Sequence, residues 1–385
     1  MARETATVSG WHSTNALGVS SAELLRILAD SGRPGITRPA QIEVSPVRYQ
    51  LTTPATAALL RITGLDDQGE QWSLFCKVIQ HPRHWLADRD LPADMARTLI
   101  ANYPWKQELG LWDEPFAATM PSGLRAPRLY RTLELGDDRI ALWMEDVSTA
   151  QPEWDLARFA RAARLLGEWN QRASRPSVVS ALNRAPHFGL KTFVGSMLRR
   201  RGLQPLADDE VWAHPWLAEA YETRAMLSTL ASQLDALITR LDGMPLCRPH
   251  GDACPQNLLV PTDAPETFVA IDISQQAPTA LGCELAQLVV GLVHAGRRPA
   301  SDLPAIVQAT VPNYIAGLRD NGWDGEELDV VRAFWTALLV RSGFDSLPYA
   351  CLDKTNEHAT VPASVAERIA LTTFIAIGAT AALQH

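Results

Sequence analysis

The stretch RPHGDACPQNLLV, residues 248–260, places a histidine, an aspartate and an asparagine in one short loop before an apolar run. His250, Asp252 and Asn257 all have side chains that can bind a ligand or act on one. A turn-rich segment between apolar runs is typical of a loop that a rigid scaffold positions for chemistry. The loop therefore raises the question of what these three side chains hold.

A hairpin following this loop brings a second acidic residue to it. We expect residues 257–260 and 268–271 to form two strands joined by PTDAPET. In an antiparallel pair the first residue of one strand lies beside the last of the other, so Asn257 and Asp272 meet at one end. Amide and carboxylate oxygens are ligands that suit Mg²⁺, with further positions left to substrate phosphates. Asp252 belongs to the loop at that same end.

The elements around this hairpin change in character near residue 150. The first part is rich in short β-type runs separated by turns, and the second part has helical periodicity almost throughout. We expect strands at residues 41–52, 57–63, 71–79, 128–135 and 139–144, with one helix starting at Pro104. We expect helices at about 153–174, 188–200, 216–241, 281–296, 302–320, 326–347 and 362–384. This predicts an α+β fold with a sheet domain at 1–147 and a helical domain at 148–385.

The pattern H-G-D-x-x-x-x-N, followed by a hairpin and an apolar residue before Asp272, resembles the catalytic and metal loops of the kinase superfamily. HGDAC is most similar to the aminoglycoside phosphotransferase and choline-kinase-like branch. The resemblance implies a two-lobed protein-kinase-like fold. It also implies that Asp252 accepts or orients a substrate hydroxyl, that Asn257 and Asp272 ligate magnesium, and that His250 braces the loop.

The same resemblance implies further parts upstream. Lys77, in the third strand-like run SLFCKVIQ, would contact the nucleotide phosphates, and a helical glutamate would pair with it. Glu108 lies at the edge of an apolar stripe, where a lone carboxylate would be costly to bury, so it is the preferred partner. Glu114 is the alternative. Phosphate coverage would fall to Thr52 and Thr53, because no glycine-rich loop is present.

A hinge between the lobes is expected at ALWMEDV, residues 141–147. Met144 would line the adenine pocket, while the Glu145 carbonyl and the Val147 amide would hydrogen-bond the base. Two further departures from the family pattern matter. Asp272 is followed by Ile-Ser, so switching by loop phosphorylation is not expected, and Glu284 stands where the family usually has an aspartate.

Composition excludes several other classes. Because 46% of the residues are apolar, the chain can bury a sizeable core. The formal charge of −8 leads us to expect no nucleic-acid or anionic-membrane partner. No signal peptide is evident, and residues 369–383 are predicted to be a buried helix rather than a membrane span. Five cysteines without a C-x-x-C pair favour a reducing cytoplasm, and Cys76 and Cys254 are expected to be small packing residues. Arg199, Arg200 and Arg201 are expected to be a solvated helix end.

The resemblance predicts a kinase that uses ATP, or GTP, with Mg²⁺ and moves the γ-phosphate to a hydroxyl of a small molecule. The first candidate acceptor is an aminoglycoside, nucleoside or other sugar-containing antibiotic, and the alternative is a metabolic sugar, amino sugar or amino alcohol. Candidates for the acceptor pocket are Asp345, Arg341, Trp335 and Tyr349. A nucleotide-binding pseudokinase and a metal-dependent hydrolase using His250 and Asp252, with His294 or His358 as further ligands, stay open as other classes.

Overall fold

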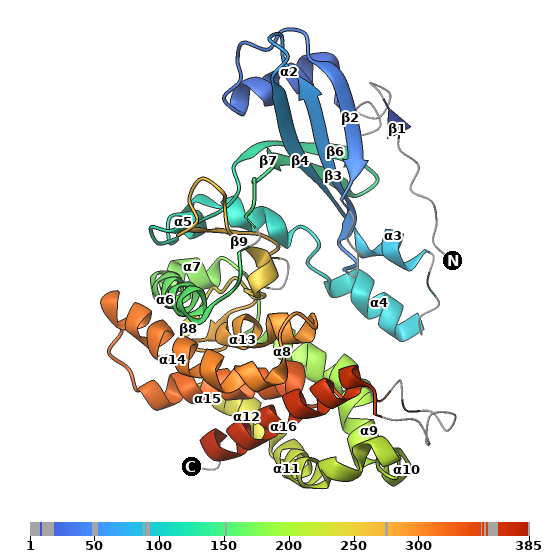
Figure 1. The fold of residues 1–385 in the computed structure, drawn as a ribbon, viewed down its shortest axis with the longest axis vertical. Coiled ribbons are helices and arrows are strands. Elements are labelled where there is room, and N and C mark those ends of the chain that lie inside the picture. Colours follow the sequence, from blue (N-terminus) through green and yellow to red (C-terminus); the bar gives the residue numbers. More distant parts are fainter. Residues whose placement is uncertain are drawn as a thin grey trace. The chain divides into compact units, whose positions relative to one another are not determined.

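The fold is taken from a computed structural model, which describes residues 8–9, 19–47, 53–87, 89, 93–150, 152–273, 276–347, 349, 352 and 361–383. The chain divides into two compact units. The small unit comprises Met1–Asp113, Ala126–Thr149 and Pro261–Asp263, and the large unit comprises Glu114–Arg125, Ala150–Val260 and Ala264–His385. Figure 1 shows the elements of each.

The small unit is built on a six-stranded sheet in the order β1-β2-β3-β4-β7-β6, with every neighbouring pair antiparallel. Its strands are β1 (Val8–Ser9), β2 (Ala40–Pro46), β3 (Thr56–Leu65), β4 (Gln71–Gln80), β6 (Leu129–Gly136) and β7 (Arg139–Glu145). The expected runs from 57 to 144 are confirmed with small changes at their ends. The run expected at 41–52 ends as β2 at Pro46, and residues 48–52 lie outside the described residues.

The two faces of this sheet pack against different segments. On one face Cys76, Val78 and Trp143 join a core with Leu24 and Ile27 of α2 (Ser21–Asp30), a helix that the sequence analysis missed. Figure 1 shows α2 lying beside the sheet. On the other face lie Ile79, Ile140, Leu142 and Met144, which pack against Trp105, Leu109 and Trp112. Because side chains alternate along a strand, Lys77 lies on this second face.

The single helix expected from Pro104 is wrong. The segment is a 3₁₀ helix, η1 (Gln107–Trp112), followed by the short helix α5 (Glu114–Ala117). Pro115 lacks an amide hydrogen and its ring would clash with the carbonyl of residue 111, so an α-helix cannot run through this position. Upstream, α3 (Pro82–Leu86) and α4 (Ala93–Asn102) are further helices that the strand-like texture did not predict.

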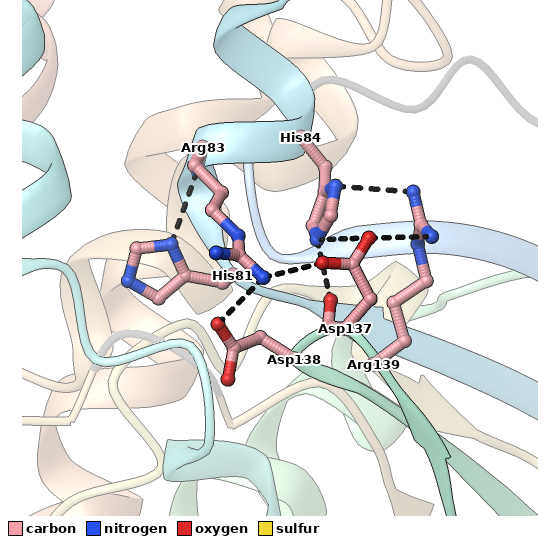
Figure 2. Close-up of polar contacts among 6 residues, drawn as sticks. All are labelled: His81, Arg83, His84, Asp137, Asp138 and Arg139. Carbon is pink, nitrogen blue, oxygen red and sulfur yellow. Dashed lines mark hydrogen bonds and ion pairs between the residues drawn. The ribbon is translucent and has the colours of Figure 1, made fainter.

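The β6–β7 hairpin is fastened to α3 by a cluster of charged and imidazole groups (Figure 2). Asp137 and Asp138 both have positive φ, 49° and 53°, as the two-residue turn of a tight hairpin requires. Arg83 Nη2 bonds both carboxylates, at 2.6 and 2.9 Å. Arg139 donates to His84 Nδ1 at 3.1 Å, so His84 Nε2 donates to the Asp137 carbonyl at 2.6 Å. These contacts fix the hairpin and thereby the strand β7 that follows it.

The large unit is mainly helical. Its principal helices are α6 (Leu156–Arg172), α8 (Phe188–Phe193), α11 (Tyr221–Ser232), α12 (Leu234–Leu241), α13 (Leu285–His294), α14 (Leu303–Asp320), α15 (Glu327–Leu338) and α16 (Ala363–Leu383). Shorter elements are α7 (Pro176–Ser180), α9 (Gln204–Ala207), α10 (Asp209–Trp212), η3 (Pro215–Ala220) and η5 (Ala300–Asp302). Two segments are π-helical, η2 (Val194–Leu203) and η6 (Leu339–Gly343). The helices expected at 188–200 and 326–347 therefore each continue into a π-helical stretch.

Close helix crossings organise this unit. α6 and α14 meet at two glycines, since a Cβ on Gly167 would lie 2.1 Å from the Tyr314 carbonyl oxygen and one on Gly317 would lie 2.1 Å from the Arg164 carbonyl oxygen. α16 is long and apolar enough, by length and composition, to cross a membrane. It nevertheless packs on α15, where Trp335 fills the space over Gly378.

Two small sheets in the large unit frame the loop at 248–257. β8 (Leu246–Cys247) pairs with β11 (Thr279–Ala280), and β9 (Leu258–Leu259) pairs antiparallel with β10 (Phe268–Ala270), which also pairs with β5 (Leu124–Arg125). A 3₁₀ turn, η4 (Pro255–Asn257), leads into β9. The predicted α+β fold class, with a sheet-based amino-terminal part and a larger helical part containing a hairpin, is confirmed.

Candidate active site

The loop at 248–257 is held by one buried carboxylate. Glu284, just before α13, accepts hydrogen bonds from the backbone amides of His250 at 2.6 Å and Gly251 at 3.1 Å. Gly251 has φ +91°, a conformation that side chains with a Cβ rarely adopt. Burial raises the pKa of Glu284, while His250 and the two amides oppose that rise. The glutamate at this position therefore reaches the loop backbone, despite its extra methylene relative to aspartate.

His250 supports the loop from inside. Its side chain is fully buried, and its ring meets Trp169 edge to face with the centroids 6.2 Å apart. The Asp252 amide donates to His250 Nδ1 at 3.2 Å. Burial lowers the pKa of His250 and favours the neutral ring that can accept this bond. The predicted bracing role agrees with this geometry, and its part in catalysis stays a prediction.

Asn257 ties the loop to the hairpin. Its side-chain nitrogen donates to the Asp252 backbone oxygen at 2.9 Å and to Asp252 Oδ2 at 3.3 Å. The Ile271 amide donates to the Asn257 carbonyl at 3.0 Å, which confirms that Asn257 and Asp272 lie at one end of the hairpin. Asp272 has φ +62°, an unusual conformation that occurs preferentially at functional sites.

The side-chain oxygens of Asn257 and Asp272 are suitable ligands for a magnesium ion. The Asn257 nitrogen is used on Asp252, so the amide oxygen is the atom that remains for a cation. Asp272, at the same end of the hairpin, adds a carboxylate, and Mg²⁺ is commonly bound by one or two such protein oxygens. The assignment of Asn257 and Asp272 as metal ligands remains a prediction.

Asp252 itself is about a third exposed, with 32% of its side-chain surface accessible, so a substrate can reach it. Burial of the rest raises its pKa, whereas Arg341 acts in the opposite direction. Arg341 Nη2 lies 3.7 Å from Asp252 Oδ1, and its Nη1 donates to the Gly251 carbonyl at 2.7 Å. The Gln287 side-chain oxygen accepts hydrogen bonds from Arg341 Nε at 2.6 Å and from Nη2 at 2.9 Å. Arg341 is thereby held rigidly beside the carboxylate.

In the small unit, Lys77 of β4 and Glu108 of η1 form the expected ion pair, with Nζ and Oε2 2.5 Å apart. Both side chains are more than nine-tenths buried. Glu114 is exposed at the start of α5, so Glu108 rather than Glu114 is the partner. A buried pair of this kind costs desolvation energy, so it is weak evidence for stability.

The segment expected as a hinge follows β7. Met144 is buried on the face of the sheet that packs against Trp105 and Leu109. The Glu145 amide donates to the Arg128 carbonyl at 2.9 Å, and the Arg128 amide donates to the Glu145 carboxylate at 3.0 Å. The Val147 amide has no hydrogen-bond partner in the part of the chain that the structure describes. The adenine-binding roles of Met144, Glu145 and Val147 remain predictions.

Thr52 and Thr53 were predicted to cover the phosphates. Thr52 lies outside the described residues. The Thr53 hydroxyl is 2.9 Å from the Tyr103 hydroxyl and also accepts from the Ala55 amide at 3.4 Å. Thr53 therefore already has partners within the small unit, and its phosphate role stays a prediction.

A cavity of about 1180 Å³ opens within the large unit next to Asp252. Three of the expected acceptor-pocket residues, Arg341, Asp345 and Tyr349, line it. Trp335 does not; it packs in the core with its ring 5.0 Å from that of Phe334 and 5.7 Å from that of Phe374. The hydrophobic periodicity of α15 gave no way to separate a core tryptophan from a pocket tryptophan.

Other residues of the cavity were not expected. Arg200 and Arg201 line it, although the three arginines in sequence were interpreted as a solvated helix end. His294 also lines it, with Nε2 3.0 Å from Ser342 Oγ and Nδ1 3.1 Å from Arg368. Burial lowers the pKa of His294 to about 4, so its ring is neutral.

The hydrolase alternative finds no ligand set in the described part of the chain. No group of three or more histidine, cysteine, aspartate or glutamate side chains suited to a metal occurs among those residues. His358 lies outside them. Burial raises the pKa values of Cys76 and Cys254 to about 12, as expected for packing residues rather than reactive thiols.

Comparison with known proteins gives structural similarities only. No protein-family model matches the sequence, and no curated protein matches it. An aminoglycoside phosphotransferase from Alicyclobacillus acidocaldarius is 16% identical, with a TM-score of 0.49 over 88% of this chain and 92% of its own. Amicoumacin kinase, solved with AMP-PNP and Ca²⁺, is 10% identical, with a TM-score of 0.48 over 94% of this chain and 96% of its own. Spectinomycin phosphotransferase, solved with ADP and spectinomycin, is 11% identical, with a TM-score of 0.44 over 95% and 99%.

Proposed function

We propose that the protein is a small-molecule kinase that transfers the γ-phosphate of ATP or GTP to a hydroxyl group of its acceptor. The observation that carries this proposal is the position of Asp252. Its carboxylate is partly exposed at the wall of a large cavity, in a loop held by Glu284 and His250. A carboxylate fixed in this way can accept or orient the proton of a bound hydroxyl.

Phosphoryl transfer needs positioning and charge neutralisation more than covalent chemistry, which suits this set of residues. Asp252 orients the hydroxyl, and Glu284 and His250 prevent the loop from shifting during the reaction. Mg²⁺, held by Asn257 and Asp272, would neutralise charge on the phosphates.

The small unit would supply nucleotide contacts. Lys77, held by Glu108, would contact the α- and β-phosphates. The backbone of Glu145 and Val147 would contact the base beside Met144, with Thr52 and Thr53 near the phosphates. These assignments follow from the resemblance, and the buried Lys77–Glu108 pair supports them.

The size of the cavity bears on the acceptor. Pockets for drug-sized ligands measure about 300–1,000 Å³, and this cavity of about 1180 Å³ is slightly larger than that range. That favours a sugar-containing antibiotic or a molecule of similar size over a small amino alcohol. A metabolic sugar or amino sugar is the competing assignment.

The proposal is tested by nucleoside-diphosphate release, ADP from Mg-ATP and GDP from Mg-GTP, against a panel of antibiotics, sugars and amino alcohols. Asp252→Asn should lower turnover by about 10²-fold or more, because general-base catalysis contributes about 10²–10⁴-fold. Asp235→Asn, at an exposed position of α12, is the matched control and should leave turnover unchanged. Turnover in Asp252→Asn equal to wild type would refute the mechanism. Mg-nucleotide should also raise the melting temperature. Absence of turnover with every acceptor, together with an unchanged melting temperature, would refute the kinase assignment.

A further inference from the structure

Positive side chains outnumber negative ones in the part of the cavity lining away from the loop at 248–257. Arg341 lies 3.7 Å from Asp252, and Glu284 is engaged with two loop amides. Asp252 and Glu284 thus both lie at the loop, and among the described residues the other charged members of the lining are three arginines and one aspartate, namely Arg200, Arg201, Arg368 and Asp345. The two histidines of the lining, His187 and His294, both have pKa values lowered by burial and add no charge. The part of the cavity away from Asp252 is therefore basic.

Arg200 and Arg201 are available to a ligand. Both are exposed on η2, and neither side chain makes a hydrogen bond or an ion pair within 4 Å with any residue that the structure describes. π-Helical turns occur frequently at functional sites, and η2 and η6, the two π-helical segments among the described residues, both contribute arginines to the cavity.

The backbone fixes where Arg201 lies. A Cβ on Gly202 would be 2.7 Å from the Phe344 carbonyl oxygen, so η2 packs directly on the chain at that point. Arg201 precedes Gly202 and Asp345 follows Phe344, which brings these two charges to one region. Arg201 and Arg368 both act on Asp345, so its negative charge is already opposed by two positive ones.

Uncharged polar groups at the same wall also have no partner. Ser346 Oγ and the Tyr349 hydroxyl are buried atoms without a hydrogen bond to any described residue, and both residues line the cavity. Buried hydroxyls are normally hydrogen-bonded, so these two hydroxyl groups, on the lining of a cavity that Arg200 and Arg201 also line, indicate a place for a ligand's oxygen atoms.

We propose that this cavity binds an acceptor bearing an acidic group, a carboxylate or a phosphate, which Arg200 and Arg201 hold while the hydroxyl lies at Asp252. Guanidinium groups match the planar oxygen pairs of such anions and bind them with charge-assisted hydrogen bonds. A polycationic aminoglycoside, one of the acceptors expected from the resemblance, would meet three arginines here. The inference rests on the proposed kinase function for the reacting hydroxyl, but the anion site itself can be measured without turnover.

The test is calorimetric binding at low salt of four probes that share a sugar ring: glucuronate, glucose 6-phosphate, glucose and glucosamine. We expect one or both anions to bind wild type at least tenfold more tightly than glucosamine, with glucose between them. The comparison of glucuronate with glucose 6-phosphate distinguishes a carboxylate from a phosphate site. In Arg200→Gln/Arg201→Gln the preference should fall at least tenfold. Arg199→Gln, a neighbouring exposed arginine outside the cavity lining, should retain it.

Several outcomes would overturn the inference. These are equal binding of the four probes, tighter binding of glucosamine, no binding of either anion, or an anion preference that survives in the double variant. Kanamycin as an efficient acceptor, with turnover lost in Asp252→Asn, would overturn it while supporting the kinase. Anion binding without any effect of Mg-nucleotide on melting would leave the anion site in place and refute the kinase.

Discussion

Gly291 of α13 is one point where the loop at 248–257 packs against the helical core. It is buried, and its carbonyl accepts a hydrogen bond from the Gln256 side chain at 3.0 Å. A Cβ at this position would lie 2.7 Å from Cys254 Cβ and 2.8 Å from Pro255 Cδ. Ordinary contact begins at about 3.4 Å, so Gly291→Ala requires the loop or the helix to move by 0.7 Å, that is 3.4 − 2.7.

The energetic effect of Gly291→Ala is modest and its kinetic effect is larger. Overpacking costs about 1–3 kcal/mol, and alanine in a helix regains about 1 kcal/mol over glycine. The net loss of stability is therefore about 0–2 kcal/mol, and the protein should still fold. Because misplacement of a reacting group by about 1 Å can cost 10²-fold in rate, a shift approaching that size should lower kcat/KM by about tenfold or more.

The assay is steady-state ADP release with the acceptor identified by screening, accompanied by thermal unfolding. Gly195→Ala is the control, because a Cβ there would meet nothing within 4 Å. The control should keep wild-type kcat/KM. A Gly291→Ala enzyme with wild-type kcat/KM would show that the loop is not positioned by its packing on α13, and the reasoning would fail.

Further predictions concern buried charge and thiols. Lys77→Met should destabilise the fold by about 3–5 kcal/mol in urea unfolding, because it removes the cation that pairs with the buried Glu108 carboxylate. Lys77→Met/Glu108→Gln should recover part of that loss, and equal stability of both variants would contradict the pairing argument. Arg341→Gln should move the acidic limb of the kcat/KM–pH profile to higher pH. Asp252 must be ionised to act, and Arg341 lowers its pKa, so without Arg341 the carboxylate protonates at higher pH. An unmoved limb would argue against Asp252 as the titrating group. Cys254 should resist iodoacetamide at neutral pH in peptide mapping, because burial raises its pKa to about 12, and rapid alkylation would refute that environment.

Local patterns were sufficient for much of the fold. Alternating runs gave the strands of the small unit, and 3.6-residue periodicity gave the helical character of the large one. The predicted helices were wrong where the backbone departs from regular α-helical hydrogen bonding. Pro115 divides the segment expected as one helix from Pro104, and the π-helical turns of η2 and η6 have no simple sequence signature.

The sequence by itself determined the chemical parts of the candidate site, because Asp252, Asn257 and Asp272 belong to one loop and hairpin whose strand register brings them together. The family resemblance supplied the lysine–glutamate pairing, and the sequence favoured Glu108 over Glu114, because a carboxylate at the edge of an apolar stripe needs a buried cation; the structure shows the Glu108 pair. Only the tertiary structure decided that Glu284 reaches two loop amides and that Arg200 and Arg201 face a cavity. Those relations join segments tens to more than a hundred residues apart, and they depend on how helices pack rather than on any local period.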